Sequence, residues 1–250
     1  MAPCPATAIM PLRPLSFLIC LLLLTGCAAR SQPAAPSSTI VAAAATPAPE
    51  PVYGPFPVAT LESLLLAEFA GHRQRADVAL GGYIQQALAT RDPGVVARAS
   101  TIAQFLNQPQ SLELSQLWTD VEPDNAEAWY VLALSSLRQQ RYEMLIPALD
   151  RLLALQPEAD LEQMFLSAIP TTPTGQQSLL NALEAVEQKH HDSPHILFAR
   201  ALVLTQAGAR EPALDFAHRA RLLRPESIQT TLLEAKILTD LNRNAEVAHL

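Results

Sequence analysis

Three prolines recur at a fixed spacing and constrain the fold of this chain more than any other feature. Pro123 and Pro157 lie 34 residues apart, and Pro225 follows Pro157 at twice that distance. The sequence between them is rich in Ala, Leu, Gln, Glu and Arg, which favour helix, and has few β-branched runs. A period of this length indicates stacked helical units, none of which buries its apolar stripe alone.

The period divides the chain into units that agree at other positions. If each proline stands at position 32 of a 34-residue unit, the units span 92–125, 126–159, 160–193 and 194–227, and an incomplete unit spans 228–250. Position 8, where two helices would pack closely, is small throughout: Ala99, Ala133, Ser167, Ala201 and Ala235. A helix pair at 61–91 fits only after a three-residue shift of frame. We interpret it as a divergent N-terminal capping repeat.

Two units resemble tetratricopeptide repeats (TPRs). In 126–159 the family's places hold Trp129, Leu132, Ala133, Tyr142, Leu149 and Pro157, and in 194–227 they hold Ala201, Gly208, Ala213, Ala220 and Pro225. The resemblance implies an all-α fold over residues 59–250, a right-handed TPR-type α-solenoid of helical hairpins. The alternative is an irregular helical bundle, against which the constant period argues.

The N-terminus has the order of a secretory signal. Arg13 precedes the apolar run Leu15–Leu24, which is about half the length of a membrane-spanning helix, and small residues follow. Cys27 comes directly after Leu24, Thr25 and Gly26, which resembles a bacterial lipobox. We therefore expect residues 1–26 to be a signal peptide and Cys27 to carry the lipid. An ordinary signal with a chance cysteine is the alternative.

The segment at 27–58 follows as a disordered tether rich in Ala and Pro, since closely spaced prolines block both helix and sheet. Cys4 and Cys20 leave with the signal, so the mature chain would hold no disulfide and no cysteine-based metal site. Ala28 after the lipobox favours the outer membrane by resemblance to bacterial lipoproteins, and the chain would face the periplasm. With only two lysines and a formal charge of -7, the sequence is a poor candidate for nucleic acid.

Residues 64–106 resemble the opening of a family of TPR lipoproteins from gamma-proteobacteria. The best-known member is the lipoprotein partner of a periplasmic carboxyl-terminal processing protease. That resemblance implies a non-catalytic adaptor that binds the protease and brings cell-wall hydrolases to it. The alternative function is an assembly factor of an envelope machine, such as a pilotin or a polysaccharide-export component. In either function the chain binds other proteins, and neither function needs a cofactor.

The concave face of a TPR solenoid gives candidate partner-binding residues. Positions 5 and 9 of each first helix tend to face it, and here they are mostly apolar, which suits an apolar strand or an amphipathic helix. The scarcity of Lys, Asn and Arg argues against a carboxylate clamp. The candidates are Tyr130, Leu134, Met164, Phe198 and Leu202. Alternatively, these side chains pack against the neighbouring helix.

Catalytic and metal sites are not indicated. His190, His191 and His195 surround Asp192, but without cysteine we interpret the group as a solvated turn between repeats rather than a metal site. No phosphate-binding loop or nucleophile motif occurs.

Two irregularities stand out in the repeats. Pro170 and Pro173 should end the first helix of the third unit near Ile169 and leave a loop, either a contact site or a tolerated irregularity. The last unit stops after a stub, Ala245–Leu250, so we expect either a longer repeat array or another element covering that end.

Overall fold

The computed structural model describes residues 57–250, which form helices and no strand. The predicted signal peptide, the lipobox and most of the predicted tether, with Leu24, Thr25, Gly26 and Cys27, lie outside the described residues. The helices are α1 (Val58–His72), α2 (Ala76–Thr90), α3 (Pro93–Phe105), α4 (Ser111–Val121), α5 (Ala126–Arg138), α6 (Tyr142–Leu155), α7 (Glu162–Ser167), α8 (Pro173–Glu187), α9 (Pro194–Gln206), α10 (Arg210–Leu223), α11 (Ile228–Asp240) and α12 (Asn244–Val247).

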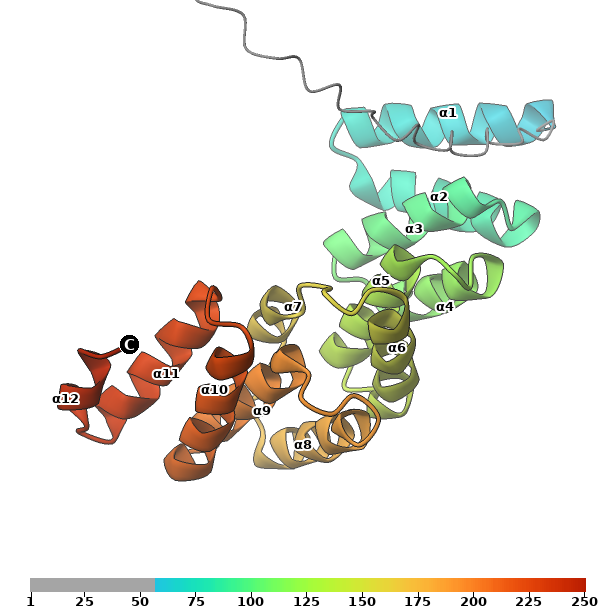
Figure 1. Cartoon of the computed structure of the whole chain (residues 1–250). Coiled ribbons are helices and arrows are strands. Elements are labelled where there is room, and N and C mark those ends of the chain that lie inside the picture. The colour runs from blue at the N-terminus through green and yellow to red at the C-terminus, as the bar shows by residue number, and fades with distance from the viewer. Residues whose placement is uncertain (1–56) are drawn as a thin grey trace, which may run out of the picture. The chain divides into compact units, whose positions relative to one another are not determined.

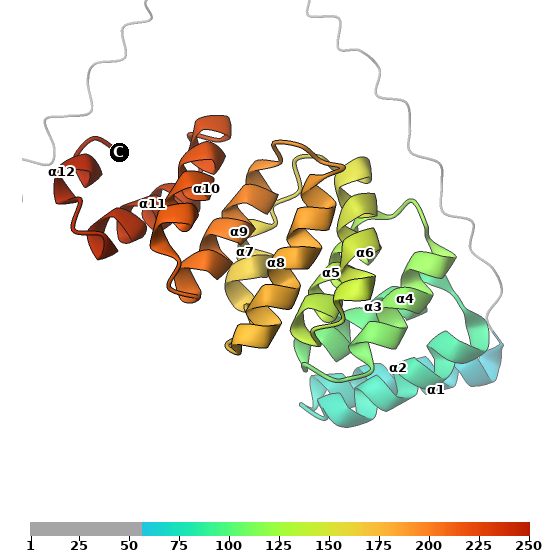
Figure 2. The same cartoon turned by 90° about the horizontal axis from the view of Figure 1, so that it is seen from below.

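Consecutive helices form antiparallel hairpins that stack on one another (Figures 1 and 2). Within hairpins, α1 packs against α2, α3 against α4, α5 against α6 and α9 against α10, and between hairpins α2 meets α3, α4 meets α5 and α10 meets α11. The predicted all-α TPR-type solenoid is therefore confirmed. Among the described residues, none of the helices has both the length and the apolar character needed to cross a membrane.

Local sequence explains where several helices begin. The side chains of Asp92, Asn125, Thr172 and Ser227 each accept a hydrogen bond from a backbone N–H in the first turn of the helix that follows. Such caps satisfy donors that the helix itself leaves free. Proline occupies the first turn of α3, α8 and α9, where its missing N–H costs nothing.

The buried apolar side chains form two clusters along the stack. One joins α1 to the first half of α5 and includes Tyr83 and Trp118. The other runs from α4 to α11 and includes Phe165 and Phe198. Gly82 allows the close approach of α1 and α2, because a Cβ there would lie 2.9 Å from the Cβ of Ala67.

The unit at 160–193 departs from the repeat as the prolines predicted. α7 ends at Ser167, two residues before the expected end, and α8 begins only at Pro173. The intervening loop is held in place, since Gln176 Nε2 donates a hydrogen bond to the Pro170 carbonyl at 3.2 Å. As a result α7 packs against α9, and α6 packs directly against α8.

A buried polar cluster joins three helices near their N-termini. The Glu162 carboxylate of α7 accepts hydrogen bonds from Ser227 Oγ at 2.7 and 2.9 Å and from Thr230 Oγ1 at 3.2 Å, both from the start of α11. Arg224 Nη1 lies 3.6 Å from Glu162 Oε1 and 3.4 Å from His195 Nδ1. The cluster links the third unit to the fifth.

His195 belongs to this cluster, so its predicted place in a solvated turn is wrong. Its side chain is only 1% exposed, because α9 begins at Pro194 and His195 lies in the first turn against α7 and the end of α10. Burial, and secondarily the nearby Arg224 guanidinium, lower its pKa from the usual 6.5. The folded protein therefore favours the neutral form of His195.

This lowered pKa predicts that the fold loses stability in mild acid. Below pH 6.5 the unfolded chain protonates His195 while the folded protein resists, so the free energy of unfolding falls as the pH drops through that range. The His195→Gln variant, which cannot titrate, should lose less stability between about pH 7.5 and about pH 5.5. Urea denaturation at several pH values measures this. Equal pH dependence in both proteins would contradict the prediction.

Candidate protein-binding groove

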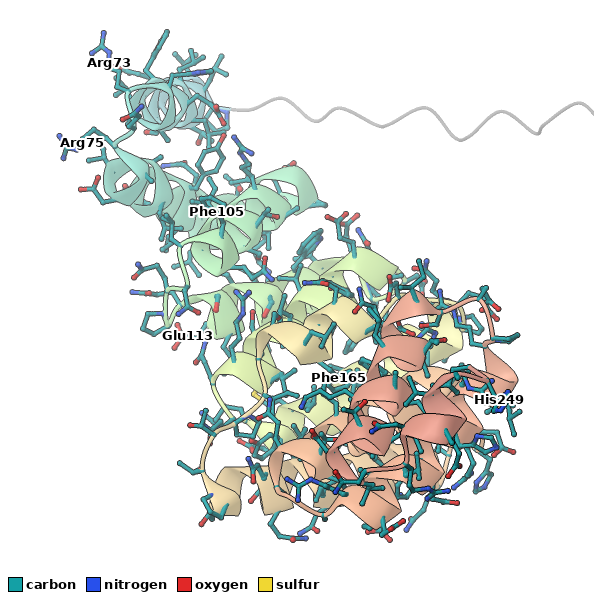
Figure 3. All side chains as sticks on the ribbon, turned by 90° about the vertical axis from the view of Figure 1, so that its left-hand side faces the viewer. Arg73, Arg75, Phe105, Glu113, Phe165 and His249 are labelled. Atoms are coloured by element: carbon teal, nitrogen blue, oxygen red, sulfur yellow. The ribbon has the colours of Figure 1, made fainter. Side chains whose placement is uncertain are left out.

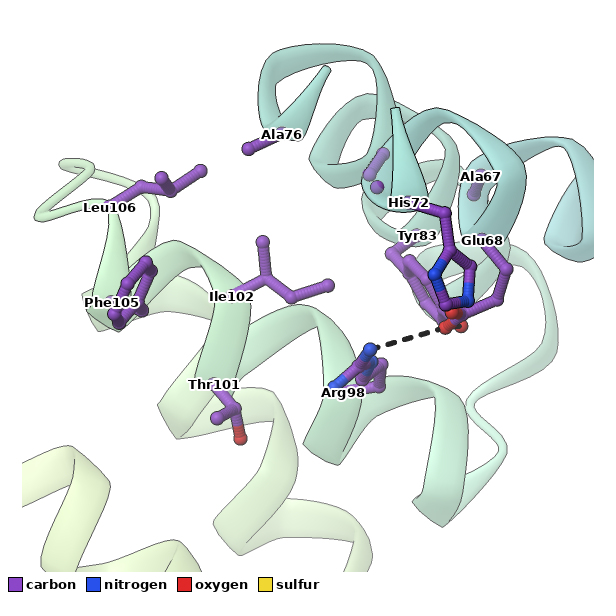
Figure 4. A pocket seen from close by; sticks show the side chains of 12 residues that line it. Ala67, Glu68, His72, Ala76, Tyr83, Arg98, Thr101, Ile102, Phe105 and Leu106 are labelled. Carbon is purple, nitrogen blue, oxygen red and sulfur yellow. Dashed lines mark hydrogen bonds and ion pairs between the residues drawn. The ribbon is translucent and has the colours of Figure 1, made fainter. Parts of the chain in front are cut away.

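The first two hairpins enclose a groove between α1, α2 and α3 (Figure 4). Its volume is about 460 Å³. Most of its lining is apolar, and a few polar side chains converge at one wall, which is the usual composition of a ligand site. The lining residues are Ala67, Glu68, Gly71, His72, Ala76, Ala79, Tyr83, Arg98, Thr101, Ile102, Phe105 and Leu106.

The polar wall is built from one residue of each helix. Tyr83 Oη of α2 donates a hydrogen bond to the Glu68 carboxylate of α1. Arg98 of α3 contacts the same carboxylate, with Nη2 at 3.3 Å from Oε1, and its guanidinium lies 6.0 Å from the centre of the Tyr83 ring. The dashed line in Figure 4 marks the Arg98–Glu68 contact.

This arrangement keeps Glu68 charged and Tyr83 neutral. The hydrogen bond from Tyr83, with a smaller contribution from Arg98, lowers the pKa of the Glu68 carboxyl. Burial, followed by the hydrogen bond to Glu68 and then by the Glu68 charge, raises the pKa of the Tyr83 hydroxyl. Since Arg98 and Glu68 both remain partly exposed, the wall offers one fixed cation and one fixed anion beside an apolar floor.

Phe105 is the most exposed large apolar side chain beside the groove, at 85%. It lies at the last residue of α3 and also lines a second, more polar cavity of about 480 Å³. That cavity is formed with the ends of α5 and α7 and with the loop before α8. Its other lining residues are Asn107, Leu137, Arg138, Gln140, Ser167, Ala168, Ile169, Pro170 and Thr171.

The exposed ring of Phe105, which lines both the groove and the second cavity, is suited to contact a peptide segment of another protein. Aromatic and Arg side chains are enriched among the residues that dominate binding energies at protein interfaces. The groove supplies both in Phe105 and Arg98, each on the rigid helix α3. An apolar side chain of a partner would fill the floor, and a polar one would meet Arg98 or Glu68.

The predicted partner-binding residues lie elsewhere and are mostly core. Met164 and Phe198 are each 1% exposed, and Leu134 and Leu202 are below a tenth. Their burial contradicts the prediction that these four side chains line a binding face and agrees with the alternative that they pack against neighbouring helices. Tyr130 alone is half-buried, and burial raises the pKa of its hydroxyl.

Sequence reasoning missed Phe105 and Arg98. Both belong to the unit that begins at Asp92, but neither falls on positions 5 or 9. The available signal was a phenylalanine in the last turn of a helix, outside the stripe formed by Val95, Val96 and Ala99.

The histidine group does not form a metal site. His190 Nε2 lies 2.8 Å from Asp150 Oδ1, and His191 is exposed. The Lys189 ammonium, together with His190, lowers the pKa of the Asp150 carboxyl. Within residues 57–250, no three His, Cys, Asp or Glu side chains are placed to hold a metal ion.

A known protein is similar to this chain in sequence. No family model matches the chain. The chain is 36% identical, over 199 residues, to a TPR repeat-containing protein of Pseudomonas aeruginosa. The match covers 79% of this chain and 34% of the relative, so the chain spans about a third of that protein's length.

Solved structures show more distant likeness. MamA from Desulfovibrio magneticus RS-1, from residue 41 to its end, is 13% identical, with a TM-score of 0.43, and the match covers 78% of this chain and 92% of that one. YrrB, described as a TPR protein with an unusual peptide-binding site, is 13% identical, with a TM-score of 0.40 and coverage of 68% and 89%.

Proposed function

We propose that this TPR-type repeat protein is a non-catalytic adaptor that captures segments of other proteins in the groove between α1, α2 and α3. The observation that carries the proposal is Phe105, exposed at the junction of two cavities and set on the same helix as Arg98. A solvent-exposed phenylalanine has no role in the packing of its own repeat. Its position fits an anchor for a partner chain.

The site of action in this proposal is the periplasmic face of the outer membrane. Its support comes from the sequence, where Leu24, Thr25 and Gly26 precede Cys27 in the order of a lipobox. A diacylglyceryl group on Cys27 would hold the chain at the bilayer, and the Pro-rich segment after it would let the repeats reach partners.

The proposed partner is a periplasmic carboxyl-terminal processing protease, with cell-wall hydrolases as the proteins delivered to it. The support for this is that residues 64–106 resemble the opening of lipoproteins of that kind. The 36% identity to a TPR repeat-containing protein of Pseudomonas aeruginosa supports the more general role of a repeat protein that binds other proteins. Residues 64–106 also contain Phe105 and Arg98, so the resemblance and the groove involve the same part of the chain.

Replacing the anchor should weaken partner capture without affecting the fold. We expect Phe105→Ala to bind its partner about 10- to 30-fold more weakly, the loss typical of a central aromatic residue at an interface. The tagged full chain and the variant are used to capture proteins from detergent-solubilised envelope, and the captured proteins are identified. Affinity for the purified partner is then measured by titration.

Leu222→Ala is the matched control, since Leu222 is an exposed apolar residue on α10, away from the groove. It should capture the partner as the parent chain does. Recovery of a serine protease by the parent chain would support the adaptor, whereas recovery of secretin or polysaccharide-export proteins would favour an assembly factor. Equal capture by Phe105→Ala and the parent chain would move the binding site elsewhere.

A further inference from the structure

The face of α1 that points away from α2 is a second apolar surface, which adjoins the groove at Glu68 and His72. It carries five large side chains that are between 50 and 82% exposed: Val58, Leu61, Leu65, Leu66 and Phe69. Four of them recur every three or four residues, so they follow one side of the helix. A contiguous exposed apolar stripe on a folded domain marks a contact site.

Helices inside the stack have no such face. In α5, every residue from Ala128 to Leu137 is buried or half-buried, because hairpins lie on both sides. α1 has α2 on one side only and is the first helix of the described repeats (Figure 1). Its apolar stripe is therefore free to pack against another helix.

The charges beside the stripe favour one such helix, namely α1 of a second copy. Glu62 lies near the start of α1, and Arg73 follows its last residue. Figure 3 shows Arg73 and Arg75 projecting from the end of this hairpin. Glu62 has no ion pair within the described residues, and neither does Arg73. An antiparallel partner places its basic end beside the acidic end of the first helix.

One register satisfies the apolar and the charged pairs together. When Leu66 of one copy lies opposite Phe69 of the other, the two-fold axis passes between residues 67 and 68. The same axis places Glu62 opposite Arg73, and both pairs occur twice because the interface is two-fold symmetric. A parallel arrangement would instead bring Glu62 next to Glu62 and Arg73 next to Arg73.

We infer that this protein forms a two-fold dimer through antiparallel contact of α1 with α1 of a second copy. Ala67 and Gly71 line the groove from the opposite side of α1, and Glu68 and His72 line it from the edge of the stripe. The dimer would therefore hold two grooves near its axis. For a partner with two binding segments, both grooves would act together and raise the apparent affinity. The dimer itself does not depend on the proposed partner.

Cysteine pairs test the register directly in the detergent-solubilised full chain. A mixture of Glu62→Cys chains and Arg73→Cys chains should form a disulfide-linked dimer on mild oxidation. Each variant alone should link poorly, because two copies of the same position lie about 16 Å apart along the helix axis at 1.5 Å per residue. The parent chain, treated in the same way, controls for Cys4, Cys20 and Cys27.

Charge exchange and sedimentation provide the second measurement. Glu62→Arg and Arg73→Glu should each weaken the dimer, and the double variant should restore it. Leu66→Glu should give monomers, whereas the control Leu222→Glu should leave the dimer intact. A parent chain that sediments as a monomer, or linkage that is equal in all the mixtures, would overturn the inference. The inference would also be overturned if the parent chain were a monomer and Leu66→Glu abolished its binding to lipid vesicles or to another protein. The stripe would then contact that other partner.

Discussion

Phe198→Ala is expected to lower the free energy of unfolding by about 3 to 5 kcal/mol. Phe198 is fully enclosed in the cluster that runs from α4 to α11, and truncation would leave a cavity where several helices meet. Urea denaturation followed by circular dichroism at 222 nm, the usual wavelength for helix, measures the loss. A change below about 1 kcal/mol would contradict this account of the core.

Phe105→Ala is the matched control for that experiment. Because Phe105 is exposed at the end of α3, its truncation should change the free energy of unfolding by no more than about 0.5 kcal/mol. The two phenylalanines thus separate stability from binding. Phe198→Ala should weaken capture only as far as it unfolds the chain, and Phe105→Ala should weaken capture in a folded chain.

Glu162→Ala is expected to cost about 2 to 4 kcal/mol of folding free energy. The substitution removes the acceptor for Ser227 and Thr230 and leaves Arg224 without a buried partner. This value extends below the about 3 to 5 kcal/mol typical of broken buried pairs, since Arg224 is partly exposed and can turn toward water. The urea midpoint of the variant measures the effect.

Glu158→Ala provides the comparison for Glu162→Ala. Glu158 is exposed, lies just before α7 and makes no side-chain hydrogen bond or ion pair within the described residues. It should leave the urea midpoint unchanged within about 0.5 kcal/mol. Equal effects of the two substitutions would show that the buried cluster adds nothing to stability.

The repeat architecture was predictable because it depends on local features. The proline spacing gave the period, and Asp92, Asn125 and Ser227 are cap residues that mark helix starts in the sequence itself. Pro170 and Pro173 indicated the shortened helix for the same reason: proline removes a donor wherever it stands. These signals need no knowledge of the neighbouring repeats.

The groove was not predictable from the period, because the burial of a side chain depends on how its repeat packs against the next one. Met164 and Phe198 occupy positions that face a groove in an average TPR, but here the short α7 packs its Met164 against α9, and Phe198 of α9 is enclosed among the neighbouring helices. Phe105 is exposed because α3 ends there, at a place where the repeat pattern assigns no role. Glu162 meets Ser227 across 65 residues of sequence, a separation that no local pattern detects.

The contact between Glu162 and Ser227 affects how the solenoid unfolds. In an ideal repeat protein each unit touches only the next, so ends fray one unit at a time. Here the Glu162 cluster joins α7 to α11 and includes residues of the α9–α10 hairpin between them, so the last three units must loosen together. The first hairpins have their own apolar cluster and no such link. They form the end of the molecule that can open by itself while the rest stays folded.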